Sequence, residues 1–126
     1  MREIFTDKAP KPVGPYSQAV VYENLLFVSG QIGIDPNTGK LREGFEEQIR
    51  QVFKNIDEIL LSIGISRDKI LRVVVYMTNL SEFKKFNEVY EEYFSDVKVK
   101  PVRTTVGVCA LPLEAQVEIE VIASVS

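Results

Sequence analysis

The stretch 100–123 limits the possible folds of this 126-residue chain more than any other part of the sequence. Residues 102–108 and 117–125 each alternate between apolar side chains and side chains of other types. Successive side chains of a β-strand point to opposite faces, so such alternation predicts a strand and assigns its residues to faces. We expect two strands here, paired with each other through the short connection 109–116.

On each of these two strands, the face opposite the apolar side chains carries groups that could form a binding site. Arg103 and Thr105 share one face of the first strand, and Glu118 and Glu120 share one face of the second. If the strands pair, a guanidinium and one or two carboxylates converge on one side of the sheet, where they could bind a small anionic molecule. The alternative is a solvent-exposed ion pair across the strands, which contributes roughly 0.2–1 kcal/mol.

The absence of histidine excludes several catalytic classes. Ser-His-Asp and Cys-His nucleophile systems, His-ligated zinc and HExxH proteases all need that residue. The chain also has no GxxxxGK[ST] or GxGxxG motif, so nothing in the sequence supports a nucleotide cofactor. Any catalysis must therefore use Glu, Asp, Lys, Tyr, Arg or backbone groups, and we expect neither a metal nor a cofactor.

The net charge and the length of the apolar runs indicate which partners and which cellular location to expect. Fifteen basic and 18 acidic residues give a net charge of −3, so no overall field attracts nucleic acid, and we do not expect nucleic acid as a partner. No apolar run approaches the roughly 18 residues of a membrane span, and the first residues have no signal core. We expect a cytoplasmic protein with no membrane association and one domain, 1–126. Its single Cys109 is expected to be a small buried apolar residue.

Two amphipathic stretches predict helices. Over 43–63, apolar residues recur at helical spacing, and Gly64 supplies a C-terminal cap. Ser81 could cap a second helix over 82–94. Asn87 lies within the apolar stripe of that helix, either as a capping or edge contact or as a polar group aimed into an interface.

The remaining segments predict strands and one loop. They are a possible edge strand at 4–5, a hairpin of 16–22 and 25–29 that turns at Glu23-Asn24, a loop at 30–40, and a central strand at 70–77. The resulting order predicts an α+β fold, one mixed sheet with two helices packed on one face. The other face should carry Arg103, Thr105, Glu118 and Glu120 among apolar side chains, which predicts self-association.

Taken together, these segments resemble the Rid (YjgF) family of reactive-intermediate deaminases. The motifs are GPYSQAV at 14–20, FVSGQIG at 27–33, FEEQIRQVFKNIDEIL at 45–60, FNEVYEEYF at 86–94, and PVRTTVGVCALP at 101–112 followed by VEIEVIA. They cover essentially the whole chain in the family's order. The resemblance implies a chorismate-mutase-like fold and a cytoplasmic homotrimer with active sites between subunits. It also implies hydrolysis of 2-imino and 2-enamino acids, such as 2-aminoacrylate, to 2-keto acids and ammonia.

The resemblance also implies roles for individual residues. Arg103 corresponds to the carboxylate-binding arginine and Glu118 to the glutamate that activates water. The other positions are Tyr16, Ser29, Gly30 and Thr105 for substrate binding, with Asn87 at the interface. The family often has cysteine where this chain has Thr105, which puts regulation through a thiol in doubt more than hydrolysis.

The sequence is also compatible with other functions. The chain could be a ligand-binding or translation-regulating member of the same family without enzymatic activity. A ribonuclease is disfavoured by the net charge and the missing histidine. A glycosidase that uses Glu118 and Glu120 would need a sugar-binding aromatic groove, of which the sequence shows no sign. A binding protein has no need of Glu118, so its presence favours the deaminase.

Overall fold

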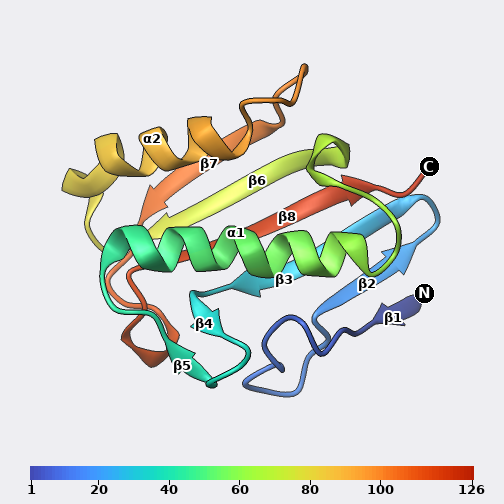
Figure 1. Ribbon diagram of the computed structural model, residues 1–126, viewed down its shortest axis with the longest axis horizontal. Helices are drawn as coiled ribbons and strands as arrows, with labels where there is room; N and C mark the ends of the chain where they lie inside the picture. The colour runs from blue at the N-terminus through green and yellow to red at the C-terminus, as the bar shows by residue number, and fades with distance from the viewer.

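The computed structural model describes residues 1–126 and shows two layers, a six-stranded sheet and two helices (Figure 1). The sheet strands are β1 (Arg2–Ile4), β2 (Ala19–Tyr22), β3 (Leu25–Gln31), β6 (Ile70–Met77), β7 (Val102–Gly107) and β8 (Val117–Ser124). The helices are α1 (Phe45–Leu61) and α2 (Phe83–Tyr93). Short 3₁₀ turns are η1 (Arg67–Lys69), η2 (Leu80–Glu82) and η3 (Pro112–Glu114).

Both helices cover the same face of the sheet, which confirms the predicted α+β architecture (Figure 1). The strand order is β1-β2-β3-β8-β6-β7, and only β6 and β7 run parallel. The helix α2 connects these two strands, as a parallel pair requires a crossover. The apolar row of β8 is completely or almost completely buried against the helices, as its alternation predicted. None of the helices is both long and apolar enough to cross a membrane.

The predicted pairing of the two C-terminal strands is wrong. Strand β6 lies between β7 and β8 and pairs with both. Its long apolar run belongs at the centre of a sheet, where a strand has neighbours on both sides. The connection 109–116 therefore passes over the end of β6 and does not form a hairpin.

The face assigned to Arg103 and Thr105 is also wrong. Arg103 is in register with Val73, whose side chain is completely buried in the core. Arg103 and Thr105 thus point to the helix-covered face, and the apolar row of β7 points to the open face. Glu118 and Glu120 do lie on the open face, opposite the core row of β8.

Several local predictions need smaller corrections. The segment 30–40 is not only a loop, because β4 (Ile34–Asp35) pairs with β5 (Lys40–Leu41). Ser81 does not cap the second helix: the N-cap residue of α2 is Glu82, which makes no side-chain cap bond. Ser81 lies in the preceding turn η2, where its N–H donates to the side chain of Asn79. Cys109 is exposed, since its loop leaves the sheet at the end of β7. The predicted cap at Gly64 is confirmed, with φ of 76° and the Ile65 N–H donating to the Leu60 carbonyl.

Candidate functional site

Glu118 is the central acidic group of the candidate site, and Gly30 is what makes room for it. A Cβ atom built on Gly30 would lie only 2.0 Å from Glu118 Oε2 and 2.8 Å from its Cδ. The strand position therefore excludes any side chain while the carboxyl is in place. The structure brings together these two predicted site residues, from neighbouring strands β3 and β8.

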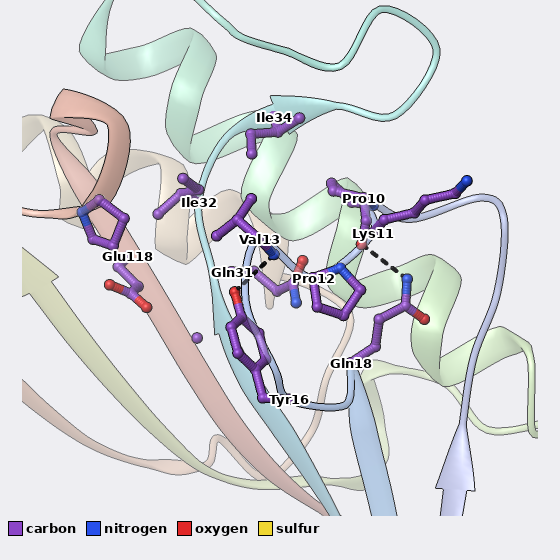
Figure 2. A pocket seen from close by; sticks show the side chains of 12 residues that line it. Pro10, Lys11, Pro12, Val13, Tyr16, Gln18, Gln31, Ile32, Ile34 and Glu118 are labelled. Atoms are coloured by element: carbon purple, nitrogen blue, oxygen red, sulfur yellow. Dashed lines mark hydrogen bonds between the residues drawn. The ribbon is translucent and has the colours of Figure 1, made fainter.

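Tyr16 and Ser29 lie beside them. Figure 2 shows Tyr16 and Glu118 on either side of β3, lining one pocket. The Val13 N–H donates to the Tyr16 hydroxyl at 3.2 Å. Ser29 Oγ donates to the Ser17 carbonyl at 2.6 Å, so its hydroxyl ties β3 to the segment that carries Tyr16.

Gln18 holds the outer wall of this pocket, and sequence reasoning missed it. Its buried side chain accepts from the Thr6 N–H at 2.8 Å and donates to the Pro10 carbonyl at 2.9 Å (Figure 2). These bonds fix the Pro-containing segment 10–13, which lines the pocket with Gln31, Ile32, Ile34 and Pro112. The sequence signal for this role is the position of Gln18 within a strand-like run. An amide that is buried there is almost always hydrogen-bonded.

The Glu118 carboxyl has an environment that favours its protonated form. Burial raises its pKa, and the nearby Glu120 carboxylate raises it further. Glu120 accepts a hydrogen bond from the hydroxyl of Tyr76. Tyr76 lies on β6, in register with Glu118 of the neighbouring strand β8. A carboxyl poised in this way can exchange protons nearer to neutral pH than an ordinary glutamate.

Arg103 lies in a different setting, over an aromatic surface of α2. Its guanidinium carbon is 4.6 Å from the centre of the Tyr90 ring and 5.6 Å from those of Phe83 and Phe86. Rings at this distance attract a cation through their faces. The guanidinium makes no hydrogen bond or ion pair within the chain, so it is free to bind an anion. Sequence reasoning did not anticipate this aromatic support.

Thr105 and Asn87 accompany Arg103. Thr105 lies two residues after Arg103, on the same face of β7, and its Oγ1 is buried without a hydrogen-bond partner. Asn87 is half-buried on α2, four residues after Phe83 and three before Tyr90, so it shares their helical face. The predicted interface role of Asn87 stays a prediction.

The predicted site residues thus form two groups that one chain keeps apart. We call Tyr16, Ser29, Gly30 and Glu118 the acidic group, and Arg103, Thr105 and Asn87 the basic group. Arg103 and Glu118 lie two strands and three residues apart on opposite faces, which places their Cα atoms roughly 14 Å apart. Their expected convergence on one face of a single sheet does not occur.

The chemistry available to the two groups is acid-base work and anion binding. No group of three or more Cys, Asp or Glu side chains gathers as a metal site would require. The acidic group offers a carboxyl that can take and return a proton. The basic group offers a planar guanidinium suited to a carboxylate.

Comparisons with known proteins cover the whole chain. Residues 6–125 match the family model described as Endoribonuclease L-PSP. A RutC family protein of Aquifex aeolicus is 61% identical over 123 residues, with 98% of each chain covered. Reactive Intermediate Deaminase A, chloroplastic, of Arabidopsis thaliana is 43% identical, covering 96% of this chain and 64% of the plant protein.

The fold agrees with that of a solved relative. The crystal structure of E. coli TdcF with bound serine superposes with a TM-score of 0.95 at 35% identity, covering 100% of both chains. The matches in sequence and fold run from one end of the chain to the other and include the segments that carry both groups. The chain therefore belongs to the Rid (YjgF) family.

Proposed function

We propose that this protein is a 2-iminobutanoate/2-iminopropanoate deaminase, which hydrolyses reactive enamine and imine acids such as 2-aminoacrylate to 2-keto acids and ammonia. The observation that carries the proposal is the half-buried Glu118 carboxyl, held against Gly30 beside Tyr16 with a raised pKa. A relative named as a reactive intermediate deaminase supports the general activity. The particular substrate is our inference.

Arg103 is proposed to hold the substrate carboxylate. Its guanidinium has no anionic partner in the chain and can form two parallel N–H···O bonds to a carboxylate. This binding fixes the adjacent C2 carbon, the electrophile of the reaction. Serine, which the TdcF structure contains, likewise has a carboxylate next to a carbon that bears nitrogen.

Glu118 is proposed to activate the water. Water adds its oxygen to C2 of the protonated imine, one water proton passes to Glu118, and the C=N electron pair moves to nitrogen. Glu118 returns that proton to the nitrogen of the carbinolamine. As the C–N bond breaks and ammonia leaves, the C=O bond forms and the hydroxyl proton passes to the departing ammonia. An enamine reaches the same path after it takes up a proton at C3.

Two copies of the chain are proposed to complete each site. The pocket at Glu118 has a volume of about 40 Å³, and Arg103 is not among the residues that line it. Arg103 lies on the opposite face of the sheet. A neighbouring copy that brings its basic group to this pocket would complete the site, and a closed homotrimer provides three such contacts.

A binding protein without enzymatic activity is the competing function, and the comparison of Glu118→Gln with Glu120→Gln separates the two. Glu118→Gln keeps the shape but removes the base, so deaminase turnover should fall roughly 10²–10⁴-fold. Binding of 2-oxobutanoate should survive, because Arg103 remains. Turnover is followed by coupled release of keto acid from freshly generated 2-aminoacrylate.

The Glu120→Gln variant is the matched control, since Glu120 shares the open face but bonds to Tyr76. Its turnover at neutral pH should change far less. If Glu120→Gln abolished turnover and Glu118→Gln did not, the base would be Glu120. If neither variant lost turnover, the binding-protein function would replace the deaminase.

A further inference from the structure

Two buried hydroxyls in this chain have no hydrogen-bond partner, those of Tyr90 and Thr105. They are the only buried side-chain polar atoms left unpaired. An unpaired buried hydroxyl destabilises a fold, so each exception needs a physical reason. The positions of the two hydroxyls suggest one physical reason for both.

Both hydroxyls belong to residues that adjoin Arg103. The Tyr90 ring is the aromatic ring closest to the guanidinium, 4.6 Å from its carbon. Thr105 follows on the same face of β7. Arg103 itself has no acceptor in the chain, so three donor-bearing side chains from α2 and β7 gather where no acceptor is present. A ligand with acceptor oxygens would satisfy them.

We infer that Tyr90 belongs to the carboxylate-binding site: its ring positions the guanidinium of Arg103, and its hydroxyl donates a hydrogen bond to the bound carboxylate. The inference rests on the proposed function and adds a specific donor to it. Because the guanidinium of Arg103 lies 4.6 Å from the centre of the Tyr90 ring, a carboxylate that binds the guanidinium also lies near Tyr90.

The protonation state of Tyr90 suits the role of a donor. Burial raises the pKa of its hydroxyl, and the positive charge of Arg103 opposes this only in part. The hydroxyl therefore keeps its proton at neutral pH. A protonated phenol can donate to a carboxylate, whereas a phenolate would repel it.

Tyr90→Phe tests the hydroxyl while it keeps the ring beneath Arg103. We expect the affinity for 2-oxobutanoate, measured by calorimetry, to fall about 10-fold, as for the loss of a hydrogen bond to a charged group. KM for 2-iminobutanoate should rise about as much, with kcat within about twofold. The melting temperature should stay the same or rise, because an unpaired buried hydroxyl is removed. Tyr90→Leu, which also removes the ring, should bind more weakly still.

Tyr93→Phe is the matched control on the same helix. The Tyr93 hydroxyl donates to Asp57, away from Arg103, so its loss should lower the melting temperature and leave affinity and KM unchanged. The inference about Tyr90 is overturned if Tyr90→Phe binds like the wild type while Arg103→Ala loses binding, and the proposed function then stands. Unchanged binding by Arg103→Ala would remove the carboxylate site from Arg103 and overturn both.

Discussion

At the scale of single residues, the environment of Glu118 suits proton exchange and costs some stability. Its pKa is raised by burial and then by Glu120. Between the ordinary pKa of a glutamate and this raised value, the folded chain binds more protons than the unfolded chain. The contribution of Glu118 to stability therefore falls as pH rises through this window.

The pH dependence of hydrolysis should reveal the same shift. If Glu118 is the base we propose, it acts only when ionised, so kcat/KM should fall as pH drops through its raised pKa, with a midpoint above that of an ordinary glutamate. Glu120→Gln removes the second cause of the shift and should move this acidic limb to lower pH. A pH profile of kcat/KM for both proteins checks it, and identical limbs would contradict the proposed influence of Glu120.

At the scale of elements, the close packing of β3 against β8 sets the position of the carboxyl. Gly30→Ala places a methyl group only 2.0 Å from the present position of Glu118 Oε2. Because the displaced atoms are the flexible end of a side chain, we expect the fold to persist and the carboxyl to shift. Displacement of a catalytic group by about 1 Å can cost roughly 100-fold in rate, so we expect a loss of that order, measured in the coupled assay.

A double-mutant cycle identifies the cause of that loss. If Gly30→Ala acts by moving Glu118, it should have little further effect in a Glu118→Gln background. A full additional loss in the double variant would show that Gly30 serves the site in another way, for example through its backbone.

Sequence patterns predicted the helices and strands better than they predicted which strands lie side by side. Strict alternation placed Glu118 on the open face, because the other row of β8 had to fill the core. The same rule failed for β7, an edge strand whose apolar row is exposed and whose Arg103 is covered by aromatic rings. Whether a guanidinium faces solvent or the rings of a helix distant in sequence depends on packing. The helix between β6 and β7 was the available signal for their parallel pairing.

At the scale of the whole molecule, the sheet has one face that the chain itself does not cover. That face carries exposed apolar side chains on strands at both ends of the sheet: Tyr22, Phe27, Val102 and Val106. It also carries Glu118, while the basic group lies behind it under α2. Sequence motifs proposed the members of both groups, but the distance between the groups follows only from the strand order. Their separation in one chain makes association the natural way to bring them together.

Mixing two inactive variants tests this arrangement directly. Arg103→Ala keeps the acidic group and Glu118→Gln keeps the basic group, so each alone should lack turnover while it still assembles. If every site takes Arg103 from one copy and Glu118 from its neighbour, random mixing in equal amounts makes both groups intact at about one quarter of the sites. Co-refolded mixtures should therefore regain about a quarter of wild-type turnover, with light scattering to confirm three copies per particle. Arg103→Ala mixed with the Arg103→Ala/Glu118→Gln double variant is the control and should stay inactive, because no copy in it carries Arg103. No recovery in the first mixture, or monomers at micromolar concentration, would rule out a site shared between copies.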